Sequence, residues 1–387
     1  MDLRVRMIQE YAEGHSISAL AEMHSVSRKT IYKWLERYDE EGAAGLADRH
    51  RAPHDSPNKV SAKMVDLIIA ARHRWRWGPY KLRIKLVEQN PCLTVPAAST
   101  IGEVLQRAGL THRRKRRVRT PPYAQPFAAV EGANQTWCAD FKGWFRTGDG
   151  TRCDPLTITD AHSRYLLRCQ ITPKADTIHV TAVFDAAFRE HGLPLVIHTD
   201  NGVPFASTAP GGLSRLSMHW IRLGILPERS RLASPQDNGR HERMHGTLKQ
   251  ATLRPPERTP RRQQAAFDRF RHEYNHERPH EALADATPAS RYSSSPREMP
   301  RRIAKLEYEE DIEVRRISQQ GSLKWKGERT FVSEVFAYEW IGLRPLNERL
   351  FEVRYGPVPV GYFDGYSHRF RRKLSGKQKQ QLGKTTA

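Results

Sequence analysis

The chain has 387 residues and a formal net charge of +21, which is high for this length. A chain of this size has room for two to four domains. Its excess of Lys and Arg predicts a polyanionic partner, either nucleic acid or an anionic membrane surface. No apolar stretch approaches the roughly 18 residues that span a bilayer, and the first residues lack the apolar core of a signal peptide.

These exclusions make nucleic acid the expected partner, with no membrane contact and a cytoplasmic, nucleoid-associated location. The charge is concentrated, since residues 51–120 carry 16 Lys and Arg against 4 Asp and Glu. The 4 cysteines form no CxxC pair and have no matching His pair, so free thiols are expected and a structural zinc site is not.

Residues 1–50 are predicted to form a helix-turn-helix domain. Apolar residues at Ile31, Trp34, Leu35 and Tyr38 follow helical spacing, and Ser27 is placed to cap that helix. Its exposed start is basic and hydroxylated, which is typical of a helix that contacts DNA. The predicted DNA contacts there are Arg28, Lys29, Thr30 and Lys33. A helical hairpin without DNA-binding function has the same apolar pattern and stays an alternative.

Residues 60–110 are predicted to form a second helix-turn-helix domain, possibly winged. The linker at 111–130 that follows contains six cations in the seven residues 113–119. Such a run neutralises DNA phosphates without reading sequence, and it is also typical of a solvated tether. The predicted contacts in the linker are Arg113, Arg114, Lys115, Arg116 and Arg117.

Residues 131–295 are predicted to form an α/β core. Three short apolar strands in 135–172 precede a helix over 177–191, and a further strand covers 195–199. Residues 300–370 are rich in Val, Phe, Tyr and Trp between turns, which predicts a small β-barrel. The tail at 371–387 is basic and polar, and disorder is expected there.

Three carboxylates are the candidates for chemistry. Asp140 lies in an apolar strand, where an isolated charge is costly and needs a partner or a metal. Asp200 ends a strand and precedes Asn-Gly, a pattern that an ordinary turn also shows. Glu242 lies on a predicted helix, with Lys249 seven residues later, and a single helical Glu is usually a solvated surface residue. The hypothesis therefore depends on the three together.

Phosphodiester cleavage is chemistry that needs such a set. Two Mg²⁺ ions can activate the attacking oxygen and stabilise the leaving oxygen, and Mg²⁺ takes a few carboxylates while keeping several waters. We therefore expect Asp140, Asp200 and Glu242 to hold two Mg²⁺ ions, for which Mn²⁺ could substitute. Lys249 is expected to contact DNA beside them.

The segments TWCADFKGWF, HTDNGVPFAS and SPQDNGRHERMHGTLK resemble the three signature blocks of the integrase core domain. This domain occurs in retroviral integrases and in insertion-sequence transposases of the IS3 and IS481 families. The resemblance covers about residues 10–295. It implies an RNase H-like fold and a DDE triad at Asp140, Asp200 and Glu242.

This sequence departs from the family pattern in two places. Asp200 and Glu242 are separated by 41 residues, where about 35 are typical, and the excess is assigned to a loop in STAPGGLSRLS. The zinc-binding N-terminal domain of retroviral integrases has no counterpart here. Asp160 is the chief rival carboxylate, interpreted as a turn or capping residue.

The expected function is a DNA transposase that binds the terminal inverted repeats of a mobile element, cleaves them and joins the 3′-hydroxyls to target DNA. Pairing of two ends implies at least a homodimer. The alternatives are a DNA-binding regulator with an inactive integrase core and a structure-specific RNase H-like nuclease.

Overall fold

The computed structural model describes residues 3–49, 59–111, 130–230 and 239–374. It divides into two compact units, Met1–Val65 and Asp66–Ala387. The predicted DNA contacts Arg113, Arg114, Lys115, Arg116 and Arg117, and residues 375–387 of the predicted tail, lie outside the described residues. No described helix is both long enough and apolar enough to cross a membrane.

The first unit is a helical domain built around a helix-turn-helix. It contains α1 (Leu3–Ala12), α2 (Ile17–Met23), α3 (Arg28–Glu41) and a 3₁₀ turn, η1 (Gly42–Leu46). The Ser27 hydroxyl accepts from the Thr30 backbone N–H and caps α3, as predicted. Met7, Leu20 and Ile31 form a core shared by the three helices. The predicted helical fold of this region is confirmed, with α1 as an additional helix.

A second group of helices comprises α4 (Ala62–Trp75), α5 (Pro79–Gln89) and α6 (Ala98–Arg107). Pro79 occupies the first turn of α5, where its missing N–H costs nothing. Leu82, Ile101 and Leu105 are fully buried in this group. Residues 59–111 contain no strand, so the wing suggested by the sequence is not confirmed in that range.

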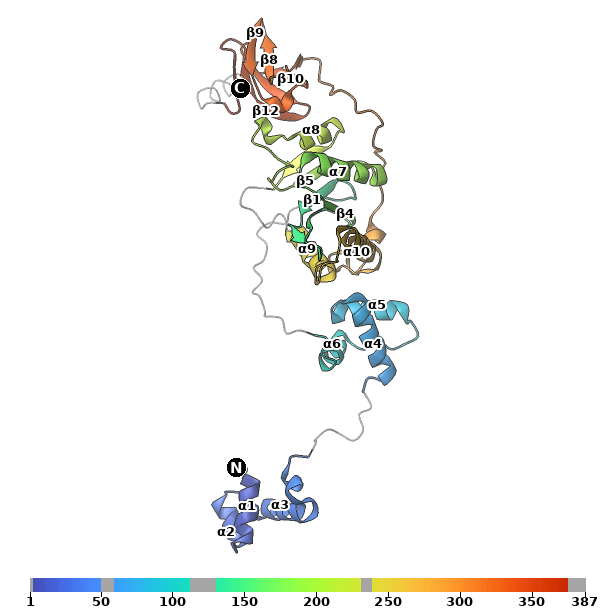
Figure 1. The fold of residues 1–387 in the computed structure, drawn as a ribbon, viewed down its shortest axis with the longest axis vertical. Coiled ribbons are helices and arrows are strands. Elements are labelled where there is room, and N and C mark those ends of the chain that lie inside the picture. The colour runs from blue at the N-terminus through green and yellow to red at the C-terminus, as the bar shows by residue number, and fades with distance from the viewer. Residues whose placement is uncertain (1–2, 50–58, 112–129, 231–238, 375–387) are drawn as a thin grey trace. The chain divides into compact units, whose positions relative to one another are not determined.

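The central α/β domain is built on a six-stranded sheet (Figure 1). Its strands are β1 (Thr136–Phe141), β2 (Phe145–Arg146), β3 (Arg152–Asp160), β4 (Leu166–Thr172), β5 (Val196–Thr199) and β6 (Leu226–Arg229). β1 pairs antiparallel with β3 and parallel with β5, and β5 pairs parallel with β6. The antiparallel strands β1 to β4 followed by the parallel strands β5 and β6 match the predicted RNase H-like core, which is confirmed as the fold of this region.

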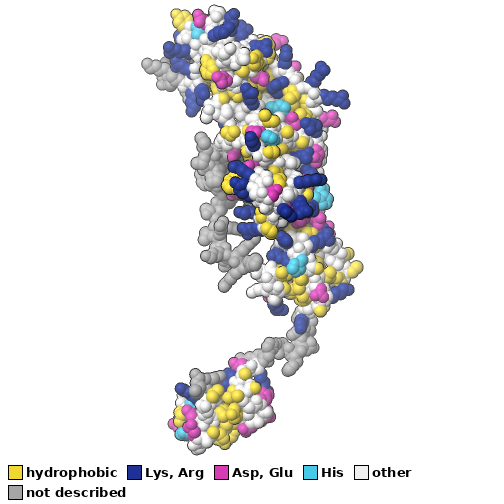
Figure 2. All heavy atoms as spheres, in the orientation of Figure 1, with side chains coloured by type: hydrophobic (Ala, Val, Ile, Leu, Met, Phe, Trp, Pro, Cys, Tyr) yellow, Lys and Arg dark blue, Asp and Glu magenta, His cyan; other side chains and the backbone are white. Residues whose placement is uncertain are grey.

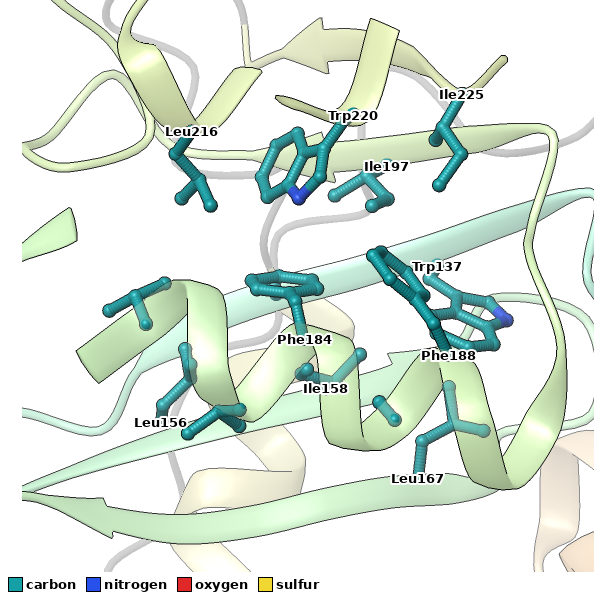
Figure 3. Close-up of a cluster of buried hydrophobic side chains, with 14 of the residues drawn as sticks. Trp137, Leu156, Ile158, Leu167, Phe184, Phe188, Ile197, Leu216, Trp220 and Ile225 are labelled. Atoms are coloured by element: carbon teal, nitrogen blue, oxygen red, sulfur yellow. The ribbon is translucent and has the colours of Figure 1, made fainter. Parts of the chain in front are cut away.

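Helices cover both faces of this sheet. On one face, α7 (Thr177–His191) and α8 (Arg215–Arg222) enclose a core in which Phe184 and Phe188 approach Trp137 and Trp220 (Figure 3). On the other face, α9 (Gly239–Thr252) and α10 (Pro260–His272) bury Met244, Leu248 and Phe267 against β4. The sheet is therefore the middle layer of an α/β/α sandwich.

The extra length between Asp200 and Glu242 is only partly loop. Residues 207–214 contain a 3₁₀ turn, η2 (Pro210–Gly212), but α8 begins at Arg215 within the segment expected to be loop. Leu216 and Trp220 of α8 are fully buried in the central core. The sequence near Gly211 and Gly212 did not predict this helix, because the apolar residues against which it packs belong to α7 and β5.

Helices α4 and α5 are anchored to the segment that follows α10. This segment includes η4 (Glu273–Glu277), a turn of π-helix. The indole N–H of Trp75 donates to Glu277 at 2.9 Å, and that of Trp77 donates to Glu273 at 2.7 Å. Since both indoles are buried, each polar N–H needs such an acceptor.

The C-terminal region forms two sheets rather than a closed barrel. The larger has the order β13-β12-β11-β10-β7, and β8 pairs only with β9. The strands are β7 (Glu313–Arg316), β8 (Ser322–Trp325), β9 (Glu328–Phe331), β10 (Trp340–Pro345), β11 (Leu350–Tyr355), β12 (Val358–Asp364) and β13 (Arg369–Arg371). Among the described residues the sheet order does not close, so the barrel prediction is not confirmed.

Both C-terminal sheets share one core with the central domain. Leu323 of β8 and Val353 of β11 belong to the same apolar cluster as Met218 and Ile221 of α8. α8 therefore packs with one side on the central sheet and with the other on the C-terminal sheets.

Replacing Leu20 with Ala should unfold the first unit selectively. Loss of a fully buried Leu costs about 2–5 kcal/mol, a large share of the stability of so small a domain. Hydrogen exchange of the full chain should show lost protection in α2 and α3 and unchanged protection in α7. Tyr32→Ala is the control, because Tyr32 is exposed on α3; equal loss of protection in both variants would contradict this packing.

Candidate active site

Strand pairing brings Asp140 and Asp200 together. In the parallel pair β1–β5, Ala139 lies opposite Thr199. Asp140 and Asp200 are the next residues on the two strands, so they lie side by side where both strands reach their carboxyl ends. This edge of a parallel pair is where α/β proteins most often place ligand-binding groups.

Asp140 is in an unfavourable environment for a negative charge. Burial, together with the nearby charges of Asp200 and Glu242, raises its pKa to about 7, against the lowering effect of a backbone hydrogen bond and of Lys142. The three predicted carboxylates therefore interact electrostatically in the folded chain. The helix α9 supplies Glu242, which is exposed, whereas Asp140 and Asp200 are half-buried.

Asp200 also organises the turn that follows it. Its Oδ1 accepts from the backbone N–H of Gly202 at 3.0 Å. A Cβ built on Gly202 would lie 3.1 Å from Asp200 Oδ2, so Gly allows the turn to approach the carboxylate closely. The turn interpretation and the functional interpretation of Asp200 are thus compatible, since the same side chain can serve both.

Two histidines beside these carboxylates were not predicted from the sequence. His241 and His245 lie one turn apart on α9, and both are buried. Their Nε2 atoms are 2.9 and 2.7 Å from Thr157 Oγ1 on β3. His245 Nδ1 is 3.9 Å from Asp140 Oδ2. The i, i+4 spacing of the two histidines was the available signal, but it is weak without knowledge of which strand faces α9.

Burial keeps both imidazoles neutral. It lowers the pKa of His241 to about 4, and it lowers that of His245 further, with contributions from His241 and Lys142. They therefore act as neutral hydrogen-bonding groups at physiological pH.

A lysine side chain also lies at this edge of the sheet. Lys142 follows Asp140 by two residues, and its pKa is lowered by burial and then by the charge of Lys249 on α9. Lys142 and Lys249 are thus near enough to repel each other beside Asp140. Two cations next to clustered carboxylates suit a substrate that is itself a phosphodiester anion.

Asp160, the rival carboxylate, lies in a separate hydrogen-bond network. Its Oδ1 accepts from the Asn134 N–H at 2.8 Å, and its Oδ2 accepts from the backbone N–H and hydroxyl of Ser163 at 2.7 and 2.6 Å. Asp160 is completely buried. Its Oδ2 closes the β3–β4 turn and its Oδ1 binds the segment that precedes β1, which agrees with the turn or capping role expected from the sequence.

The three carboxylates offer the oxygen ligands that Mg²⁺ prefers, without forming a closed metal site. No three His, Cys, Asp or Glu side chains among the described residues form a ready-made metal-holding group. Mg²⁺ does not need one, because it keeps several waters and binds through one or two carboxylates together with substrate phosphate. The repulsion felt by Asp140 is what a bound cation would relieve.

The predicted DNA contacts of the first unit lie at the start of α3. Arg28, Lys29 and Lys33 are exposed, and Thr30 is half-buried with its hydroxyl 2.8 Å from Ser27 Oγ. Elsewhere, Lys and Arg side chains occur along the whole visible face of the second unit (Figure 2). On this face, the basic charge of that unit is thus spread out.

Comparison with family models gives matches in both halves of the chain. Models of the integrase core domain match residues 130–235 and 223–288. A helix-turn-helix domain matches residues 3–54, and a homeodomain-like domain matches residues 30–105. The integrase core matches together span the strands, turn and helix that carry Asp140, Asp200 and Glu242.

A curated relative and two solved structures are similar over parts of the chain. A 31.7 kDa protein of insertion element IS407 from Burkholderia multivorans is 27% identical over 276 residues, 70% of this chain and 93% of that protein. The HTLV-2 integrase catalytic core domain in complex with magnesium is 18% identical (41% of this chain, 97% of that one, TM-score 0.33). The simian T-cell lymphotropic virus intasome with PP2A regulatory subunit B56 gamma is 14% identical (76% and 96%, TM-score 0.37).

Asp160→Asn and Asp140→Asn should affect stability differently. Asp160→Asn leaves buried N–H donors without a charged acceptor and should lower the free energy of unfolding by about 2–3 kcal/mol. Asp140→Asn should cost much less, because burial and two neighbouring carboxylates already oppose the Asp140 charge. Urea denaturation at pH 8 without divalent cations measures both; a larger loss for Asp140→Asn would contradict these assignments.

Proposed function

With helix-turn-helix domains before an integrase core domain, this chain belongs to the transposases and integrases of the insertion-sequence type, and we propose that it is a DNA transposase. It binds the terminal inverted repeats of a mobile element, cleaves the element ends and joins the freed 3′-hydroxyls to target DNA. The observation that supports the proposal is the adjacent placement of Asp140 and Asp200 at the ends of β1 and β5, with the charge of Glu242 acting on Asp140.

The proposed reaction has two phosphoryl-transfer steps. In the first, water attacks a phosphorus at the element end, which breaks one phosphodiester bond and leaves a 3′-hydroxyl and a 5′-phosphate. In the second, that 3′-hydroxyl attacks a phosphorus of target DNA, which forms one phosphodiester bond and releases a target 3′-hydroxyl. No covalent protein–DNA intermediate is needed.

Asp140, Asp200 and Glu242 would hold two Mg²⁺ ions, or Mn²⁺ in their place. When bound, such ions supply Lewis-acid stabilisation of the attacking and leaving oxygens. The half-buried carboxylates of Asp140 and Asp200 lie on a rigid sheet edge, and Glu242 comes from α9. Lys142 and Lys249 would offset phosphate charge at the same edge and so position the DNA strand.

Sequence recognition is assigned to the N-terminal helices. The exposed residues Arg28, Lys29 and Lys33 at the start of α3 are suited to phosphate and base contacts in the major groove. The basic residues 113–117 add non-specific affinity in this proposal. Because two element ends must be joined together, the active form is at least a homodimer on paired ends.

Asp140→Ala, Asp200→Ala and Glu242→Ala should each reduce end cleavage and strand transfer by more than about 100-fold, because each removes a metal ligand that stabilises the transition state. Binding of end DNA should stay within a few-fold of wild type. Asp268→Ala, at an exposed carboxylate on α10, is the matched control.

The assay uses end-sequence duplexes, intact and pre-cleaved, with Mg²⁺. Joining at wild-type rate by any of the three variants would remove that residue from the triad. A wild-type chain that binds ends but never nicks them would instead be a regulator with an inactive core. Cleavage without any joining of pre-cleaved ends would identify a nuclease.

The double variant Arg28→Ala, Lys29→Ala should weaken end binding and make it less salt-dependent. Each lost phosphate contact lowers the slope of log affinity against log salt by about 1, so the slope should fall by about 2. Fluorescence anisotropy at several salt concentrations measures it. Glu40→Gln, at the far end of α3, is the control; an unchanged slope in the double variant would exclude α3 from the DNA interface.

A further inference from the structure

One buried hydroxyl links β1, β3 and α9 beside the candidate site. Thr157 Oγ1 on β3 lies 3.0 Å from the Asp140 carbonyl oxygen on β1, 2.9 Å from His241 Nε2 and 2.7 Å from His245 Nε2 on α9. Thr157 is completely buried. Solvent therefore does not reach this hydroxyl, and its hydrogen goes to one of these three atoms.

Only one arrangement of the hydrogens makes all three contacts hydrogen bonds. A carbonyl oxygen only accepts, so Thr157 must donate its one hydroxyl hydrogen to Asp140. The hydroxyl then has only lone pairs left for the two imidazoles, and both must donate from Nε2. In this arrangement His241 and His245 are neutral Nε2–H tautomers, each with an unprotonated Nδ1.

The free lone pair of His245 then faces the carboxylate edge. Its Nδ1 lies 3.9 Å from Asp140 Oδ2, and two acceptors in that position do not attract each other. They favour a hydrogen donor or a cation between them. His241 Nδ1 instead lies 3.5 Å from the Thr159 hydroxyl, which can donate to it.

These contacts determine the register of α9. Met244 and Leu248 hold the helix on the sheet through apolar packing, which is not directional. Hydrogen bonds from His241 and His245, one turn apart, fix both the height and the rotation of the turn between them. Glu242 lies within that turn, so its carboxylate is positioned relative to Asp140 through Thr157.

We propose that His241, Thr157 and His245 form a positioning clamp that sets Glu242 and Asp140 in the geometry for binding a divalent cation and DNA phosphate. This inference rests on the proposed function for its catalytic consequence. The alternative is that the two histidines are ordinary satisfied core residues, whose loss affects stability alone.

Thr157→Val removes the hydroxyl at nearly constant volume, and Thr157→Ser keeps it. Thr172→Val is the matched control, because the buried Thr172 hydroxyl donates to the Asp154 carbonyl at 2.8 Å, away from α9. All three are compared with wild type by thermal denaturation, DNA affinity, single-turnover end cleavage at saturating DNA and the Mg²⁺ concentration for half-maximal cleavage.

Thr157→Val should slow cleavage by about 10- to 100-fold, the scale expected for misplaced reacting groups, and raise the Mg²⁺ requirement while DNA affinity stays unchanged. Thr157→Ser should restore most of the rate. Thr172→Val should lose a similar amount of stability yet cleave at nearly the wild-type rate. Equal slowing by Thr172→Val, or wild-type cleavage by Thr157→Val, overturns the clamp.

Two readouts do not depend on catalysis. In ¹⁵N NMR of the histidine-labelled chain, the signals lost in His241→Gln and in His245→Gln should each belong to an Nε2–H tautomer; an Nδ1–H tautomer for either overturns the proton assignment. Mg²⁺ should raise the melting temperature of wild type more than that of Thr157→Val. If wild type never cleaves DNA, the proposed function fails while these measurements still decide the clamp.

Discussion

The parallel pairing of β1 with β5 is the constraint on which the candidate site depends. The pairing of Ala139 with Thr199 brings Asp140 next to Asp200, although 59 residues separate them in the chain. A slip of one residue would turn Asp140 to the opposite face, toward the apolar cluster that contains Trp137 and Phe184. The register that buries those aromatic side chains is therefore also the register that exposes the carboxylates to a shared edge.

The rest of the fold offsets the cost of the repulsion among the carboxylates at this edge. A half-buried Asp140 with two other carboxylates nearby opposes folding, and α7 and α8 offset that cost through aromatic burial on the far face of the sheet. α8 has a second role, because its opposite side packs against the C-terminal sheets. The site and the C-terminal region are thus built on opposite ends of one continuous packing arrangement.

Cations and carboxylates occupy the same edge for different reasons. Lys142 and Lys249 repel each other, as the carboxylates do, so neither group of like charges is favourable by itself. A divalent cation complements one group and a phosphodiester complements the other. Repulsion among the carboxylates and between the two lysines is consistent with the proposed phosphoryl transfer, in which metal ions and DNA bind together.

The sequence by itself was sufficient for the properties that depend on local pattern. Helical periodicity and Ser27 predicted α3, alternating apolar residues predicted the core strands, and the three motif blocks pointed to an integrase core domain, which the family models match. Tertiary structure decided what depends on distant partners. α8 was not predicted, because its apolar residues are buried only by contacts with α7 and with the C-terminal sheets. The β-rich C-terminus has strands as expected, but whether sheets close depends on edge pairing that composition does not encode. His241 and His245 were passed over for the same reason: an imidazole becomes a positioning group only when a strand 84 residues away presents Thr157 to it.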